Sequence, residues 1–310
     1  MQVFTDSLRL AERLLQVAPR WRWCSEAERP GFLRPVLDRF FGEQRVAESD
    51  VAGWEGWGHL VVVEDAPESQ FDALAALLEG GFRPPGPLLC VAGQGRGFHG
   101  FKQRPWAGVA GNIHLVACFR PECRLEQPGA GPTVVSTVSV LEALDRVPFL
   151  RGRARVKWVN DVLVEGAKVG GVLARTQTLG DRVDTLLLGI GLNVERTPEV
   201  ARDLFVPRVG SVQAFAPPGT RVEVGRVFVH LAERLARNHE RYLAGGYSAL
   251  LETYRERSSV LGRRVRVLED TARGMGKELC RGRVTAIGEG LELYLDGDSR
   301  PVVHGRLVLD

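Results

Sequence analysis

The run LLLGIGLNV, residues 186–194, constrains the fold more than any other part of the 310-residue chain. Its leucines, isoleucine and valine predict a core strand. Gly189 and Gly191 interrupt the run, and a glycine inside a core strand marks a bulge or the close approach of a ligand or another backbone. Asn193 follows as a candidate cap, turn residue or ligand contact. The run therefore predicts a buried sheet with one strand open to a close neighbour.

Other runs predict the elements around that strand. Apolar stretches rich in β-branched residues indicate strands at residues 59–64, 88–92 and 113–119. Residues 156–159 and 168–175 indicate a hairpin that turns at Gly166. Amphipathic stretches predict a helix opened by Ser69 and closed by Gly80-Gly81, a second at 133–144, and two helices between 222 and 257. These elements place the chain in the α+β class.

The pattern changes after Ser258. Four short β-type runs follow, at residues 263–268, 281–287, 291–295 and 306–309, separated by glycine turns. They predict a small β-barrel appended to the α+β body. We divide the chain into an N-terminal segment of unclear role at 1–50, a main domain at 51–258 and the barrel at 259–310. Within the first segment, residues 8–17 show a helical stripe and residues 21–23 hint at a short strand.

Composition excludes several classes of protein. A hydrophobic content of 44% argues against disorder. Lys and Arg number 41 against 38 Asp and Glu, a net charge of +3 with no long basic run, so nothing demands a nucleic-acid partner. No apolar run approaches the roughly 20 residues of a membrane span, and no signal peptide is visible. The 5 scattered cysteines predict reduced thiols in a cytoplasm, without zinc-ligand spacing.

Residues 93–106, GQGRGFHGFKQRPW, combine four glycines with cationic side chains. Glycines let backbone N–H groups approach an anion, and the cations close over it. The segment is not a Walker loop, since no GK[ST] ending exists, and its glycine spacing is not that of a Rossmann fingerprint. The alternative is a surface loop with solvated charges.

Residues 156–173, VKWVNDVLVEGAKVGGVL, place Asn160-Asp161 between two β-type runs and Lys168 beside Gly170-Gly171. A buried, unpaired ammonium costs several kcal/mol, so Lys168 must reach water or an anion. Either the lysine binds an anion or it extends to solvent from an edge strand.

Taken in order, these segments resemble the biotin protein ligase family. The family pattern is roughly KWPND, a turn and a lysine, GIL, then GIGINV; this chain has KWVND at 157–161, Lys168, GVL at 171–173 and GIGLNV at 189–194. The resemblance continues through YRERS (254–258) and LGRRVRV (261–267), and it covers roughly residues 60–310. It implies a mixed-sheet catalytic domain of the biotin/lipoate ligase type at 51–258.

The chain departs from the family pattern in three places. The family's GRGRRGR motif aligns either with residues 98–104 or with Gly93–Gly97, and the two registers assign different cations to the phosphate. The helix-opening Ser-Thr-Asn is replaced near residues 68–70, and the proline of KWPND is Val159. These loops bind the acid in the family, so lipoate and octanoate stay open beside biotin.

The resemblance implies a two-step reaction: ATP and biotin form biotinyl-5'-adenylate and pyrophosphate, and a lysine of a carrier protein then takes the biotinyl group. It makes Lys168 and Arg104 the catalytic residues, with Lys168 bridging carboxylate and α-phosphate, and Asp161 orienting the incoming amine or holding metal. The implied substrate- and adenylate-binding residues are Ser69, Gln70, Gly95, Arg96, His99, Gly100, Phe101, Lys102, Trp106, Asn112, Asn160, Asp161, Gly171, Gly191 and Asn193.

The same resemblance implies the cofactors and partners. Mg²⁺ comes with the ATP phosphates, and no metal site of the protein's own is expected. The acceptor is a carrier domain of the biotin carboxyl carrier type, DNA is not a partner, and a homodimer is open. The barrel is expected to assist acceptor docking or ATP use, and the loop at 93–106 to order on adenylate, partly by burial of Phe98 and Phe101. The alternatives are a lipoate ligase, an octanoyl or lipoyl transferase, or a non-catalytic ligand-binding relative.

Overall fold

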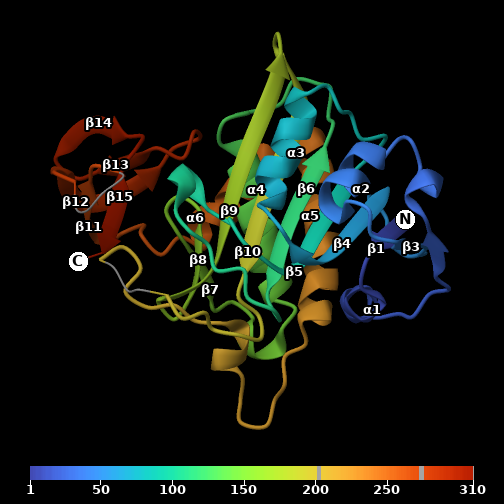
Figure 1. Ribbon diagram of the computed structural model, residues 1–310. Helices are drawn as coiled ribbons and strands as arrows, with labels where there is room; N and C mark the ends of the chain where they lie inside the picture. Colours follow the sequence, from blue (N-terminus) through green and yellow to red (C-terminus); the bar gives the residue numbers. More distant parts are fainter. Residues whose placement is uncertain (201–203, 272–275, 310) are drawn as a thin grey trace.

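The computed structural model describes residues 1–200, 204–271 and 276–309, and most of them surround one ten-stranded sheet (Figure 1). The strand order is β2-β3-β1-β4-β5-β6-β10-β9-β8-β7. Strand β1 pairs in parallel with β4, and β4 with β5; the other pairs are antiparallel. The strands are β1 (Gln2–Thr5), β2 (Arg22–Cys24), β3 (Val46–Asp50), β4 (His59–Ala66), β5 (Leu88–Gly95), β6 (Ile113–Phe119), β7 (Ala154–Lys157), β8 (Asp161–Val164), β9 (Ala167–Leu179) and β10 (Arg182–Leu192).

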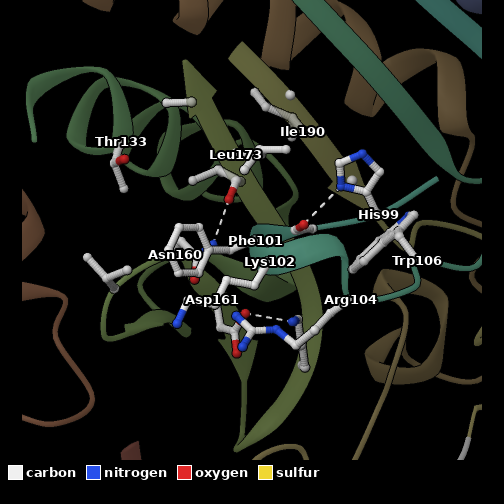
Figure 2. A pocket seen from close by; sticks show the side chains of 18 of the residues that line it. His99, Phe101, Lys102, Arg104, Trp106, Thr133, Asn160, Asp161, Leu173 and Ile190 are labelled. Carbon is white, nitrogen blue, oxygen red and sulfur yellow. Dashed lines mark hydrogen bonds and ion pairs between the residues drawn. The ribbon is translucent and has the colours of Figure 1, made fainter. Parts of the chain in front are cut away.

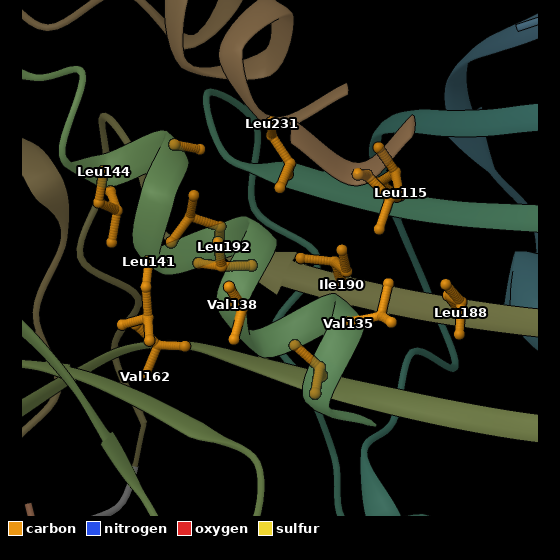
Figure 3. Close-up of a cluster of buried hydrophobic side chains, with 14 of the residues drawn as sticks. Leu115, Val135, Val138, Leu141, Leu144, Val162, Leu188, Ile190, Leu192 and Leu231 are labelled. Carbon is orange, nitrogen blue, oxygen red and sulfur yellow. The ribbon is translucent and has the colours of Figure 1, made fainter. Parts of the chain in front are cut away.

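Within the described residues, six α-helices cover the two faces of this sheet. Buried residues of α1 (Leu8–Leu15), α4 (Gly131–Leu144), α5 (Val224–Leu243) and α6 (Tyr247–Glu256) form one core with one face. Those of α2 (Arg34–Phe41) and α3 (Gln70–Glu79) form a second core. Figure 3 shows the first core around α4, where Val135 and Val138 lie beside Ile190 and Leu192 of β10.

Strand β10 shows how the sheet separates a core from a cavity. Successive side chains of a strand point to opposite faces. Leu186, Leu188, Ile190 and Leu192 belong to the first core, and Leu187 belongs to the second. Gly189 and Gly191 continue the row of Leu187, on the face that α3 covers, and Gly189 lies beside Phe71 near the start of that helix. The residues that interrupt the apolar run therefore lie where no core side chain is needed.

The α+β class is confirmed, and most predicted elements lie within a few residues of their expected bounds. The hairpin prediction was wrong in one respect: the segment forms three strands, β7, β8 and β9, joined by two turns. Glu165 and Gly166 connect β8 to β9 with φ of 49° and 77°, as a two-residue type I′ turn requires. The predicted hairpin did not include β8, which has only four residues.

The first 50 residues contribute β1, β2 and β3 to the main sheet, together with α1 and α2. Strand β1 lies between β3 and β4, so the segment is continuous with the sheet. The division of the chain into domains stays a prediction, but residues 1–50 now have a structural role.

The C-terminal residues form a second, five-stranded antiparallel sheet of order β14-β13-β12-β11-β15. Its strands are β11 (Arg264–Leu268), β12 (Glu278–Ile287), β13 (Leu293–Leu295), β14 (Asp298–Val302) and β15 (Arg306–Leu309). The barrel expectation is corrected: among the residues described, β14 and β15 form the edges and do not pair with each other. Trp158 Nε1 donates to the carbonyl of Leu291 at 2.6 Å, which ties this sheet to the β7–β8 turn.

No helix within the described ranges is both long enough and apolar enough to span a bilayer.

Gly225, in the first turn of α5, permits α1 to pack closely on α5. A Cβ added there would lie 1.9 Å from the carbonyl oxygen of Arg13. Alanine normally favours a helix over glycine, yet we expect Gly225→Ala to lower the free energy of unfolding by about 1–3 kcal/mol through overpacking. The matched control is Gly31→Ala, which meets nothing within 4 Å. Urea unfolding measures both; a stabilised Gly225→Ala would contradict the close packing.

Candidate active site

A cavity of about 900 Å³ lies on the face of the main sheet that carries Gly189 and Gly191. Its walls come from the start of α3, the segment 98–107, the β7–β8 turn, β9, β10 and the C-terminal sheet. In Figure 2, Phe101, Lys102 and Arg104 gather on the side of Asn160 and Asp161, whereas Thr133 lies away from the two cations. The cavity thus has a charged side and a more apolar side.

Lys168 and Asp161 form an ion pair on the charged side. Lys168 Nζ lies 2.6 Å from Asp161 Oδ1, and the two side chains are only 22% and 19% exposed. The ammonium also lies 5.9 Å from the centre of the Trp106 ring. Of the two sequence interpretations of Lys168, extension to solvent and approach to an anion, the geometry favours the second, because its partner is a carboxylate in the cavity wall.

A bulge in β9 turns Lys168 into the cavity. Val162 of β8 pairs with Gly170, but the next residue, Leu163, pairs with Lys168, so Val169 is an extra residue. Lys168 and Gly171 are an odd number of positions apart and would point to opposite faces of a regular strand. With the extra residue both face the cavity, and a Cβ added at Gly171 would lie 3.6 Å from Lys168 Cε.

Backbone contacts fix the residues around the pair. Lys168 N donates to the carbonyl of Arg208, and Gly210 N donates to the carbonyl of Lys168, both at 2.9 Å. Asn160 Nδ2 donates to the carbonyl of Val172 at 2.7 Å, which holds the β7–β8 turn against β9. Lysine and carboxylate are therefore held by rigid strands on both sides.

The two glycines of β10 admit aromatic side chains. A Cβ at Gly191 would lie 2.4 Å from the Trp106 ring, and one at Gly189 would lie 3.0 Å from Phe71. The close neighbours of these glycines are therefore aromatic side chains that line the cavity, and not another backbone.

His114 orients Trp106. Trp106 Nε1 donates to His114 Nδ1 at 3.3 Å, and His114 Nε2 lies 3.1 Å from the carbonyl of Val109. The imidazole must be neutral, with its proton on Nε2, to accept from the indole and donate to the carbonyl. Burial lowers the pKa of His114 to about 4, in agreement with that form.

The glycine-rich segment divides at Gly97. Gly93 and Gly95 end strand β5, and Arg96 is exposed outside the cavity lining. Residues 98–102 and 104–107 line the cavity, and His99 Nε2 lies 2.7 Å from Asp72 Oδ2 of α3. Phe98 packs beside His114 with ring centres 5.2 Å apart, whereas Phe101 is 48% exposed.

The cations of this segment reach the C-terminal sheet. Arg104 Nη1 lies 3.2 Å from Asp270 Oδ1, and Lys102 Nζ lies 3.4 Å from Asp270 Oδ2. Asp270 lines the cavity, together with residues 303–307. The C-terminal sheet therefore forms part of the site.

The structure brings most of the predicted residues together. Those that line the cavity are Ser69, Gln70, His99, Gly100, Phe101, Lys102, Arg104, Trp106, Asn160, Asp161, Lys168, Gly171, Gly191 and Asn193. Gly95, Arg96 and Asn112 do not. Asn112 Oδ1 accepts hydrogen bonds from the backbone of Val194 and Arg196, so it shapes the chain after β10. Their roles toward ligands stay predictions.

Sequence reasoning missed three residues of this site. His114 left a signal, since it is a polar residue within the apolar run 113–119. Asp72 and Asp270 left none, because each is an ordinary surface-type residue until the fold places it against a cation. In the described part of the chain, no group of three or more His, Cys, Asp or Glu side chains is arranged to hold a metal ion.

We expect His114 to titrate near pH 4 in the folded protein, about the value to which burial lowers its pKa. An unfolded chain binds this proton near pH 6.5, so His114 reduces stability as the pH falls from about 6.5 to 4. NMR titration of its ring protons measures the midpoint. A midpoint near 6.5 would show that the ring is not buried as described.

The profile of the Biotin/lipoate A/B protein ligase family matches residues 83–193.

A protein of Mycobacterium tuberculosis named biotin--[acetyl-CoA-carboxylase] ligase is 31% identical over 245 residues, which are 76% of this chain and 82% of that protein. A Bacillus subtilis protein named bifunctional ligase/repressor BirA is 26% identical over 168 residues, 54% of this chain, and the match spans 50% of that protein's length.

Among solved structures, the biotin protein ligase from Aquifex aeolicus in complex with biotin and ATP is similar at a TM-score of 0.61. The likeness covers 81% of this chain and 98% of that chain at 19% sequence identity, which establishes the fold. The profile match and the 31% identity to the Mycobacterium protein, over 82% of its length, show more than the fold. They show that the chain belongs to the biotin protein ligase family.

Proposed function

We propose that the chain is a biotin–protein ligase, which forms biotinyl-5'-adenylate from biotin and ATP and transfers the biotinyl group to a lysine of a carrier protein. The observation that carries the proposal is the Lys168–Asp161 pair, 2.6 Å apart, in the wall of a cavity that Lys102 and Arg104 also line. The name of the Mycobacterium relative supports it.

In the first step a carboxylate oxygen of biotin attacks the α-phosphorus of ATP. The new O–P bond forms as the bond to the β-phosphate oxygen breaks, and pyrophosphate leaves with that electron pair. Two anions must approach each other, so positive charge between them stabilises the transition state. Lys168 meets this need, because the bulge in β9 aims its ammonium at the cavity and rigid strands hold it there.

In the second step the amine of the acceptor lysine attacks the acyl carbon of the anhydride. The amide bond forms, the acyl C–O bond breaks, AMP leaves with that electron pair, and the proton that the amine loses passes to solvent water. Asp161 is the carboxylate beside the reacting centre, and it orients the amine by accepting a hydrogen bond. Lys168 can release Asp161 for this role once the first step has placed a phosphate beside the ammonium.

The ATP phosphates face the cations of the segment 98–106. Lys102 and Arg104 line the cavity, whereas Arg96 lies outside it, so the register that aligns residues 98–104 with the family motif fits better. If Mg²⁺ accompanies ATP, it would neutralise part of the charge of the phosphates, beside Lys102 and Arg104.

The apolar side of the cavity fits an acid with an apolar body and a polar end. Phe71 and Trp106 supply apolar walls. Gln70, a lining residue only 3% exposed, has a buried amide nitrogen, Nε2, that finds no hydrogen-bond partner among the described residues. A buried donor left unpaired is costly. The ureido carbonyl of biotin would satisfy it, and the dithiolane of lipoate offers only weak sulfur acceptors, so this residue favours biotin.

We propose a carrier domain of the biotin carboxyl carrier type as acceptor, and a cytoplasmic location. Cys24, Cys90 and Cys118 are buried free thiols, which agrees with a reducing compartment. The name of the Bacillus relative includes a repressor function, but the match spans only 50% of that protein's length. Residues 2–50 contribute β1, β2 and β3 to the main sheet, together with α1 and α2. A homodimer stays an open proposal.

The function is tested by ATP–pyrophosphate exchange with biotin, lipoate and octanoate in turn. We expect exchange with biotin and transfer of the biotinyl group to an acceptor lysine. Exchange with lipoate alone would transfer the proposal to a lipoate ligase, and binding of acid without exchange would favour a non-catalytic relative.

Removing the Lys168 charge should remove most of the first step. We expect Lys168→Ala to slow biotin-dependent exchange about a hundredfold, the effect of losing one electrostatic stabiliser. Lys277→Ala is the matched control, because Lys277 is exposed and lies outside the cavity lining. Near-normal exchange in folded Lys168→Ala would overturn the role of the lysine.

The two registers of the glycine-rich segment predict different arginines at the phosphate. With Arg104 in the cavity and Arg96 outside it, we expect Arg104→Ala to raise the KM for ATP at least tenfold and Arg96→Ala to change it less than about twofold. Steady-state exchange kinetics measure both variants. The reverse order would assign the phosphate to residues 93–97.

A further inference from the structure

Asp270 lies where an anion is required by the cations of the glycine-rich segment. Its side chain is 7% exposed, and its two oxygens face Arg104 Nη1 at 3.2 and 3.4 Å. Lys102 Nζ lies 3.4 Å from Oδ2 and also donates to the backbone carbonyl of Asp270 at 3.2 Å. One carboxylate thus bridges the two cations that line the cavity.

The C-terminal sheet fixes the position of this carboxylate. Asp270 follows the end of β11 at Leu268, which packs with Phe205 and Val308 in a small apolar cluster. Arg306 lies over the Phe205 ring at 3.5 Å. The backbone of Phe205 accepts a hydrogen bond from Lys157 of β7 at 2.5 Å. The contacts of Leu268 with Phe205, and of Phe205 with Lys157, therefore connect the segment that carries Asp270 to the main sheet.

The backbone conformation of residues 102 and 103 is unfavourable, and the ion pairs with Asp270 stabilise it. Lys102 and Gln103 both have left-handed conformations, with φ of 54° and 58°. Side chains with a Cβ rarely adopt this conformation, and two in succession cost free energy. The ion pairs with Asp270 offset that cost and hold both cations toward the cavity in the absence of a ligand.

We propose that Asp270 is a positioning residue that occupies the phosphate position of Lys102 and Arg104 in the ligand-free protein and sets the nucleotide affinity by competing with phosphate. A phosphate oxygen and a carboxylate oxygen accept the same hydrogen bonds from guanidinium and ammonium groups. Polyphosphate must therefore displace Asp270 before it can bind both cations. This inference rests on the proposed function, since it assumes that the cations serve the phosphates of ATP.

A purely structural role of Asp270 and competition with phosphate predict opposite changes in phosphate affinity when Asp270 is substituted. If Asp270 only fastens the C-terminal sheet, its removal leaves phosphate binding unchanged or weakens it. If Asp270 competes, Asp270→Asn binds inorganic pyrophosphate more tightly, by about fivefold for the loss of two partly exposed ion pairs. The KM for ATP falls by a similar factor.

The experiment is calorimetric titration of the full-length protein with inorganic pyrophosphate and Mg²⁺. The matched control is Glu269→Gln, which removes the same charge from the neighbouring, exposed residue outside the cavity lining. Asp270→Ser serves as a second variant if the asparagine variant does not fold. Amide exchange across residues 98–106 adds a readout, with faster exchange expected in ligand-free Asp270→Asn and protection restored by pyrophosphate.

Tighter pyrophosphate binding in Asp270→Asn than in Glu269→Gln and wild type supports the competition. Equal or weaker binding, with normal biotin-dependent exchange in the wild type, overturns the competition and leaves the proposed function intact. Absence of both pyrophosphate binding and exchange in the wild type overturns the proposed function and the competition with it.

Discussion

Charge compensation between Lys168 and Asp161 governs the geometry around the cavity. Both side chains are largely removed from solvent, and removing either partner would leave an unpaired charge at a cost of several kcal/mol. The pair can form only because β9 contains an extra residue, Val169, which sets Lys168 and Gly171 on one face. The β7–β8 turn, the segment at 208–210 and the bulge are thus held in the register that the ion pair requires.

The fold was largely predictable where one periodicity dominates a segment. The run 186–194 was apolar enough to identify β10, and Ser69 with Gly80 bounded α3, where Ser69 Oγ accepts a hydrogen bond from Asp72 N. Strands β1 and β3 were not predictable, because residues 2–5 and 46–50 are short and gain their structure from pairing with each other and with β4. The expected barrel became an open sheet because closure depends on pairing between edge strands, which no local pattern encodes.

The site was predictable wherever its residues belong to one segment. Asn160, Asp161 and Lys168 lie within a few residues of one another in the sequence and meet through a hairpin and a bulge. For Gly189 and Gly191 the sequence predicts a bulge or the close approach of a ligand or backbone, whereas the structure places the side chains of Phe71 and Trp106 there. A contact of either glycine with a ligand stays a prediction. Trp106 in turn depends on neutral His114, whose polar contacts appear only when β6 is buried.

The charge of the segment 93–106 shows where sequence reasoning must end. It contains Arg96, His99, Lys102 and Arg104 and no acidic residue, so its sequence demands an anion without naming the source. The structure supplies two carboxylates from elsewhere: Asp72 of α3 for His99, and Asp270 for Lys102 and Arg104, 166 residues from Arg104. Under the proposed function, the phosphates of ATP would replace Asp270 as the anionic partner of Lys102 and Arg104. The C-terminal sheet is accordingly part of the electrostatics of the cavity, although no residue pattern after Ser258 suggests it.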